Sequence, residues 1–248
     1  LNTVVNPMLN LLGGGGNKGN QLVQTGGTFN SLTGTLTPLF VGALIGQITP
    51  ATAITDVNLV LFIAMAVFAV AFVALSFVKI EDPKTSSKEN VVYERSPWAF
   101  RHFVLGAVGI FVYVGVEIGI PGTLNFFLAD TTDKGAGLSP EKATAIGGSV
   151  AATYWFLMLI GRFIGSIIAG KVSSKTMLTG ASGLGILLVL SAMFLPKIMT
   201  SMPVFTGSSF EMVEVPISAL LLVLCGLCTS IMWGGIFNLA TEGLGKYT

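Results

Sequence analysis

The sequence predicts an all-α polytopic membrane protein with six complete transmembrane helices and one apolar stub. Charged residues make up 10% of the 248 residues, whereas an average soluble protein has about 25%. Hydrophobic residues make up 52%, and the mean hydropathy is +0.80. Nine charges fall within the 23 residues from Lys79 to Arg101, so that long segments carry none. So few charges, spread so unevenly, cannot cover a soluble surface.

Each span is placed where about 20 mainly apolar residues follow one another, which is the length that crosses a bilayer. The stub, residues 1–12, lacks an initial Met and a signal-peptide pattern, and we interpret it as the end of a helix from a longer chain. The complete spans are expected at residues 28–48, 57–79, 101–128, 146–170, 176–195 and 216–240.

The connections between the spans are predicted from their polar residues. Residues 13–20, rich in glycine and asparagine, predict a flexible cytoplasmic loop. Residues 130–141 and 196–215 predict loops on the opposite side of the membrane. A helix is expected to start at Pro140, with Ser139 as its N-cap.

The charged cluster after the second complete span predicts the domain organisation. Residues 80–100 read as a solvated cytoplasmic linker, so residues 1–79 are assigned to the end of an N-terminal bundle and residues 101–248 to the start of a C-terminal bundle. Nine Lys and Arg residues fall on one side of the predicted membrane and three on the other. By the positive-inside rule, both chain ends are cytoplasmic.

The composition disfavours several classes of function. A net charge of +1 gives no basic surface for nucleic acid. His102 is the single histidine, so a histidine metal site or a catalytic triad lacks its partners. Cys225 and Cys228 lie in an apolar run and are expected to be inert packing residues. The spans offer no recognisable nucleophile and base pair, and we expect neither an enzyme nor a cofactor.

Glu117 is the acid that lies well inside a predicted span. Tyr113 precedes it by four residues and Asn125 follows two turns later, so the three share one helix face. Two roles remain open for Glu117. It is either a protonated structural group bonded to a neighbouring helix, or a carboxylate in a water-filled pathway that binds a hydroxylated ligand, carries a proton, or both.

Arg162 is the matching cation within a span, and it recurs with Tyr154 and Met158 at four-residue spacing. Because it lies about two turns from the cytoplasmic end, we favour a structural role for it over ligand contact. Aromatic rings beside amides and carboxylates suit sugars, because a pyranose has an apolar face and a rim of hydroxyls.

Three further polar or aromatic residues are candidates for ligand contact: Asn30, Trp233 and Asn238. For each of them, packing or interhelical hydrogen bonding remains an equal alternative. Small residues at four-residue spacing predict close helix packing, and they occur at Gly161, Gly165 and Ala169, at Gly115 and Gly119, and at Gly226, Ser230 and Gly234.

Several segments together resemble one family. The residues Asn2 to Pro7, the glycine-rich loop and Thr28 to Ser31 are similar to the fourth and fifth helices of the fucose, glucose and galactose permeases of the major facilitator superfamily. Tyr154 to Gly165 resembles the eighth helix of that family, and Ser230 to Thr248 resembles the tenth helix and the loop after it.

The resemblance implies a twelve-helix fold of two bundles, of which this chain holds the end of helix four through helix ten. It further implies a secondary transporter in the bacterial inner membrane that imports a monosaccharide by proton symport with alternating access. The residues assigned to substrate binding are Asn2, Asn30, Tyr113, Glu117, Asn125, Trp233 and Asn238, with Glu117 also the proton-coupling candidate.

The sequence departs from the family pattern at two positions. Asn2 stands where the fucose permeases have a carboxylate, and an amide cannot carry a proton. Gly27 stands where the fifth helix usually has glutamine. Glucose or galactose is therefore favoured over fucose. Two alternatives remain open, namely a porter for another small polar metabolite and a sugar-sensing membrane receptor without transport.

Overall fold

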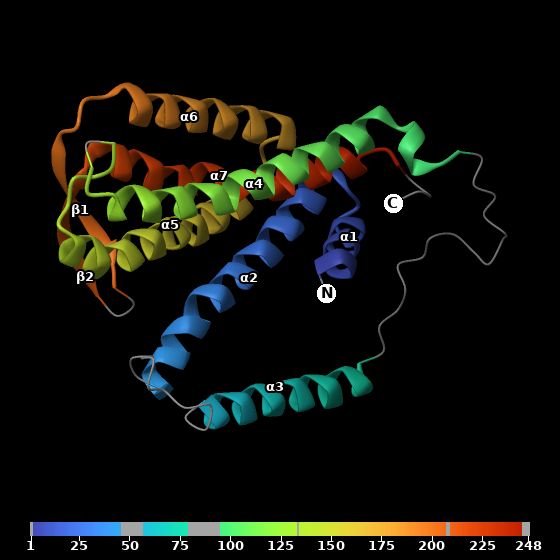
Figure 1. Ribbon diagram of the computed structural model, residues 1–248. Coiled ribbons are helices and arrows are strands. Elements are labelled where there is room, and N and C mark those ends of the chain that lie inside the picture. Colours follow the sequence, from blue (N-terminus) through green and yellow to red (C-terminus); the bar gives the residue numbers. More distant parts are fainter. Residues whose placement is uncertain (1, 46–56, 79–94, 133, 207–208, 245–248) are drawn as a thin grey trace. The chain divides into compact units, whose positions relative to one another are not determined.

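The computed structural model describes residues 2–45, 57–78, 95–132, 134–206 and 209–244. Helices dominate this part of the chain (Figure 1). In order, the elements are α1 (Asn2–Leu12), α2 (Gly16–Ile45), α3 (Asn58–Phe77), the 3₁₀ helix η2 (Pro97–Ala99), α4 (Arg101–Ala129), α5 (Pro140–Ala169), α6 (Ser174–Phe194), β1 (Met199–Phe205), β2 (Phe210–Pro216) and α7 (Ile217–Thr241). This is the partial all-α polytopic fold that the composition predicts, with one added hairpin.

Five of the described helices are long and apolar enough to cross a membrane: Asn58–Phe77, Arg101–Ala129, Ile146–Ala169, Ser174–Phe194 and Ile217–Thr241. They agree with five predicted spans to within two residues at each end. The remaining predicted span, 28–48, falls on α2, and its last three residues lie outside the described part. The chain is a multi-pass membrane protein.

The loop predicted over residues 13–20 is shorter than expected, because α2 already begins at Gly16. The turn from α1 to α2 uses three glycines with positive φ, namely 71° at Gly14, 71° at Gly15 and 57° at Gly16. Glycine adopts this conformation without steric cost. The polar residues that follow are helical because their amides find partners: Asn20 and Gln24 are both buried.

The chain forms two compact units, one of residues 1–32 with 91–248 and the other of residues 33–90. In the second unit, none of the described α3 residues is buried, as expected for a helix whose surroundings are lipid. The linker predicted over residues 80–100 lies mainly outside the described residues. Its end forms η2, where the Ser96 hydroxyl accepts a hydrogen bond from the Trp98 N–H.

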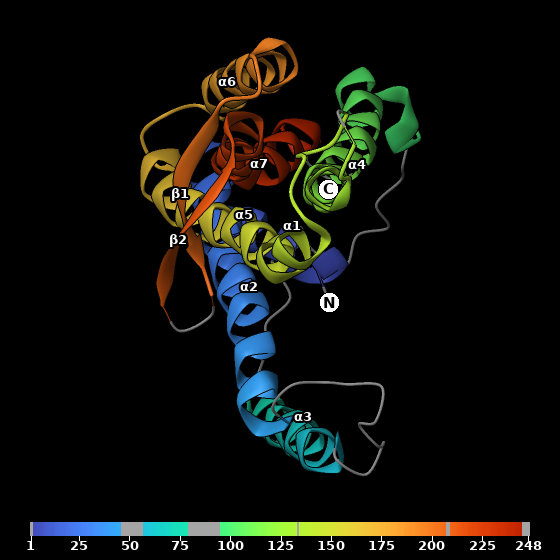
Figure 2. The same cartoon turned by 60° about the vertical axis from the view of Figure 1, so that its left-hand side comes forward.

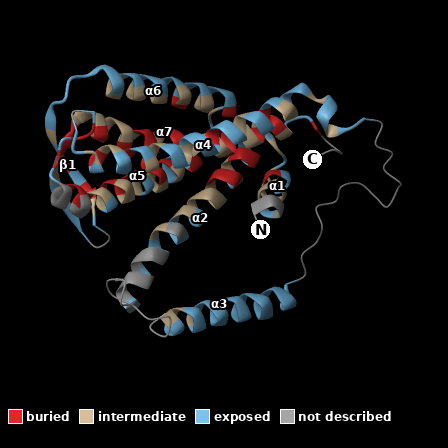
Figure 3. Cartoon of the chain, in the orientation of Figure 1, coloured by how far each residue is buried: buried red, intermediate tan, exposed pale blue. Residues whose placement is uncertain are grey.

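Within the first unit, α7 is the central helix and packs against α4, α5 and α6 (Figure 2). Buried positions run along α7, whereas α6 has only two buried residues in its described length (Figure 3). Small residues set the α5–α7 distance, because a Cβ atom at Gly161 would collide with Ser230 and one at Gly165 with Ile231. This confirms the close packing predicted for that pair of helices.

The prediction for the glycines of α4 is not confirmed in the same way. A Cβ atom at Gly115 or Gly119 would meet no described atom within 4 Å. Their four-residue spacing therefore marks an open face of α4 in this part of the chain. By contrast, the predicted start of α5 is confirmed, since the helix begins at Pro140 and the Ser139 carbonyl accepts from Ala143.

Residues 196–215 were expected to form a loop, and this prediction is wrong. β1 and β2 pair antiparallel from Met199 opposite Pro216 to Phe205 opposite Phe210. The buried side chains of Met202, Val204 and Val215 join the apolar core of α4, α5 and α7. Phe210, Val213 and Val215 are residue types that are common in strands, and they are the sequence signal of this hairpin.

Candidate functional site

An ion pair lies inside the apolar spans of the first unit. Arg162 Nη2 of α5 lies 3.1 Å from Glu117 Oε1 of α4, and the two side chains are 13% and 16% exposed. A charge in a membrane span is costly unless it has a partner. The two predicted intramembrane charges therefore neutralise each other, and the structure brings together residues 45 positions apart.

Arg162 also binds two further helices. Its Nη1 donates to Ser31 Oγ at 2.6 Å and to the Gly27 carbonyl at 3.4 Å, both on α2. Its Nε donates to the Ser230 carbonyl of α7 at 3.3 Å. One guanidinium thus joins α2, α4, α5 and α7, a task that suits its rigid fork of donors.

Two tyrosines flank the ion pair. Tyr113 lies one turn before Glu117, is 3% exposed, and its hydroxyl has no hydrogen-bond partner among the described residues. Tyr154 is fully buried, and its hydroxyl donates to the backbone carbonyl of Glu117 at 3.2 Å and lies 3.0 Å from Thr229 Oγ1. We call Ser31, Tyr113, Glu117, Tyr154, Arg162 and Thr229 the charged cluster.

The other predicted site residues are not members of this cluster. Asn30 is exposed on α2 next to Ser31, and Asn125 is exposed on α4. Trp233 is half-buried and stacks on Phe237 with ring centroids 5.3 Å apart. The side chain of Asn2 lies outside the described part. These assignments stay predictions.

Asn238 belongs to a second polar group, where α1 and α2 meet α6 and α7. Its Nδ2 donates to Ser174 Oγ at 2.9 Å. In the same region Asn10 Nδ2 donates to Thr241 Oγ1 and Gln24 Nε2 to the Ile231 carbonyl, each at 2.9 Å. We call Asn10, Gln24, Ser174, Asn238 and Thr241 the amide cluster, which contains no ionisable side chain.

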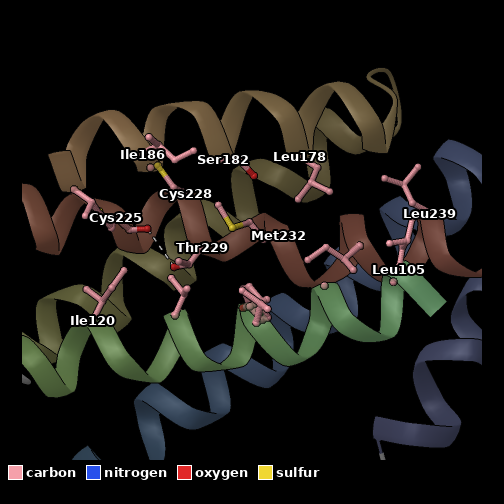
Figure 4. A pocket seen from close by; sticks show the side chains of 18 of the residues that line it. Leu105, Ile120, Leu178, Ser182, Ile186, Cys225, Cys228, Thr229, Met232 and Leu239 are labelled. Carbon is pink, nitrogen blue, oxygen red and sulfur yellow. Dashed lines mark hydrogen bonds between the residues drawn. The ribbon is translucent and has the colours of Figure 1, made fainter. Parts of the chain in front are cut away.

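A cavity of about 750 Å³ lies between α4, α6 and α7 (Figure 4). Its lining is mostly apolar, with Leu105, Leu178 and Met232 as examples, and the polar groups Ser182 and Thr229 are few. Such a surface offers few partners for the hydroxyls of a sugar. The charged cluster has the better chemistry for a polar substrate.

Three members of the charged cluster were not predicted from the sequence. Ser31 and Thr229 are hydrogen-bonding groups of the cluster, and the Tyr154 hydroxyl bonds the backbone of α4. One signal was present, because Pro121 follows Glu117 by four residues and so leaves a backbone carbonyl without its helical donor. Among the described residues, no group of three or more His, Cys, Asp or Glu side chains is arranged to hold a metal ion.

Comparison with known proteins identifies relatives along the whole chain. The chain is 34% identical over 257 residues to the glucose/galactose transporter of Brucella abortus biovar 1 (strain 9-941), and equally to that of strain 2308. It is 29% identical over 260 residues to a Helicobacter pylori (strain ATCC 700392 / 26695) protein whose name also contains the words glucose/galactose transporter. Each match covers 100% of this chain.

The chain spans about half the length of these relatives, 55% of the Brucella proteins and 56% of the Helicobacter protein. No protein-family model matches the sequence, and no solved structure matches it. The similarity along the full chain confirms the resemblance predicted from the motifs of the fourth, fifth, eighth and tenth helices. The chain is similar along its whole length to proteins named glucose/galactose transporters.

Proposed function

We propose that the full-length protein imports glucose or galactose by proton symport and alternating access, with the Glu117–Arg162 pair as the coupling element. The names of the relatives support the substrate class. The observation that carries the mechanism is the position of the pair. Arg162 holds Glu117 with the same guanidinium that holds Ser31 and Gly27 of α2.

The coupling follows from the charge balance of the pair. When Glu117 takes up a proton, Arg162 loses its counter-charge, and an unpaired cation inside the membrane is unstable. The guanidinium must then reorganise its bonds to α2 and α7. Proton binding at Glu117 would in this way change the contact between the predicted N-terminal and C-terminal bundles.

Glu117 is the best placed proton carrier among the described residues. The titratable or charged side chains near it are Arg162 and Tyr154 of α5, Tyr113 of α4 and, beside Tyr154, Cys225 of α7. Outside the spans, hydrogen bonds from Thr132 lower the pKa of Asp130, so that this carboxylate stays ionised to a lower pH than usual and contributes no pH dependence near neutrality.

The same proposal covers placement in the bacterial inner membrane, within a twelve-helix major facilitator fold. Lys18 follows the α1–α2 turn, and Lys171 and Lys175 lie at the α5–α6 turn. This basic end of the first unit is the cytoplasmic end by the positive-inside rule. The amide cluster lies at the same end, since Ser174 begins α6 and Thr241 ends α7.

Uptake into liposomes tests this function. The full-length protein should accumulate radiolabelled D-glucose or D-galactose when a proton gradient is imposed. Glu117→Gln should lower gradient-driven uptake at least about tenfold while sugar exchange in counterflow persists, because the neutral amide resembles the protonated carboxyl but cannot release a proton. Glu211→Gln, which removes an exposed carboxylate on β2, is the matched control and should behave as wild type.

Other results would point elsewhere. Binding of sugar in a thermal-shift assay without counterflow would favour a sugar-sensing receptor, and stabilisation by a different polar metabolite would favour another porter. Unchanged gradient-driven uptake by Glu117→Gln would remove Glu117 from the coupling mechanism.

A further inference from the structure

The starting point is a missing hydrogen bond in α4. In an α-helix the N–H of each residue donates to the carbonyl four residues earlier, so residue 121 should donate to the carbonyl of Glu117. Pro121 lies inside α4 and is buried. Proline has no N–H, and its ring crowds that same carbonyl. The backbone acceptor of Glu117 therefore needs a donor from outside the helix, since the surrounding lipid offers none.

Tyr154 of α5 supplies this donor. Its hydroxyl lies 3.2 Å from the Glu117 carbonyl, although the two residues are 37 positions apart. On its other side the Tyr154 oxygen lies 3.0 Å from Thr229 Oγ1, and because the Tyr154 proton is donated to Glu117, Thr229 is the donor in this contact. Tyr154 is completely buried, so its phenol has little freedom to leave this position.

α5 consequently holds Glu117 at two points. Tyr154 holds its main-chain carbonyl, and Arg162, two turns further along α5, holds its carboxylate at 3.1 Å. Because Pro121 has no N–H, the Tyr154 hydroxyl replaces the helical donor of this carbonyl. In an unbroken helix the carbonyl would already accept from residue 121, and the Tyr154 hydroxyl would be only a second donor to it.

We propose that Tyr154 is a positioning residue for transport: through the carbonyl that Pro121 leaves free, it fixes the turn of α4 that presents Glu117 to Arg162. The consequence for coupling rests on the function proposed above. The hydrogen bond itself does not, and it can be tested without any transport assay.

A double-mutant comparison of thermal unfolding tests the bond in the purified full-length protein. One net hydrogen bond contributes about 1 kcal/mol, and a given loss shifts the midpoint less in a longer chain, so Tyr154→Phe should lower the midpoint by about 1–3 °C. In a Pro121→Ala background, the restored N–H satisfies the Glu117 carbonyl, and Tyr154→Phe should then lower the midpoint by less than about half as much, the remainder being its contact with Thr229. Equal shifts in both backgrounds would overturn the proposal.

Two variants make this comparison robust. Gly119→Ala adds a methyl group on α4 that meets no described atom within 4 Å, so it should not lower the midpoint in either background. Pro121→Gly also restores the N–H, and it replaces Pro121→Ala if the alanine variant yields no folded protein. Loss of the background dependence with Pro121→Gly would count equally against the proposal.

Transport measurements test the positioning role. Tyr154→Phe should shift the pH profile of gradient-driven uptake and lower its maximal rate about threefold or more, with KM changed less than twofold. Adding Pro121→Ala should return the profile toward wild type. An unmoved pH profile would leave Tyr154 with a structural role only. Absence of sugar transport by the wild-type protein would defeat the proposed function but leave the thermal comparison decisive for Tyr154.

Discussion

The charged cluster and the amide cluster both connect α2 to the C-terminal helices, but they do so by different chemistry. Both join the first part of α2 to the helices after residue 100, through Arg162 in one case and through Gln24 in the other. The first contact depends on an ion pair, and under the mechanism proposed above it changes when Glu117 binds a proton. The second uses neutral amides, whose hydrogen bonds do not respond to pH near neutrality. If that mechanism holds, only the first contact depends on pH, and the second contributes a constant stabilisation.

The largest effect is expected when the ion pair of the charged cluster is broken. Arg162→Gln leaves the Glu117 carboxylate unpaired in the membrane, at an expected cost of about 3–5 kcal/mol in unfolding free energy. Adding Glu117→Gln removes that charge and should recover most of the loss, without restoring gradient-driven uptake. Denaturation of the purified full-length variants measures the loss of unfolding free energy and its recovery. If the single and double variants are equally unstable, charge pairing is not the source of the effect.

A smaller effect is expected on the amide side. A Cβ atom at Gly234 would lie 2.6 Å from Gln24 Nε2, so Gly234→Ala should displace the amide from the Ile231 carbonyl and cost about 1–3 kcal/mol. Because no ionisable group takes part, the loss should be the same from about pH 5 to 8. Thermal unfolding at several pH values checks this.

The control for Gly234→Ala is Gly119→Ala, whose added methyl group meets no described atom within 4 Å. Alanine also has the higher helix propensity, by about 1 kcal/mol. This variant should be neutral or slightly more stable. A comparable loss at both glycines would show that the packing against Gln24 is not specific.

The smallest effects are expected from single asparagine variants of the amide cluster, which test whether its hydrogen bonds are independent of one another. Asn238→Ala removes the bond to Ser174 and should cost about 1 kcal/mol, while Asn10→Ala removes the bond to Thr241 and should cost about the same. The double variant should show additive losses, because the two asparagines bond different partners. Strong non-additivity would indicate one cooperative network.

The sequence predicts the parts of this fold that depend on local composition. Five spans follow from apolar runs of membrane length, and the start of α5 follows from Ser139 and Pro140. The early start of α2 was not predictable in this way, because a helix of polar residues is stable only when partners such as Ile231 and Met177 bury its amides.

The sequence predicted which charged residues belong to the candidate site, but not that they pair with each other. Glu117 and Arg162 stand out because charges in spans are rare, but their contact depends on how α4 and α5 face each other. Ser31 and Thr229 carry no such signal, since hydroxyl groups in helices commonly bond their own backbone. The hairpin was missed although strand-favouring residues such as Val213 and Val215 were present, because loops between spans are usually short and irregular.

The hairpin is an exposed structure that is attached to the transmembrane helices. The Phe205 N–H donates to Thr153 Oγ1 of α5 at 2.8 Å, and the Phe205 ring stacks on Phe156 of α5 at 4.9 Å. β1 and β2 are thereby fastened to the helix that carries Arg162. An antibody fragment raised against the exposed residues Phe210 and Met212 would report the motion of α5 and give electron microscopy a rigid fiducial.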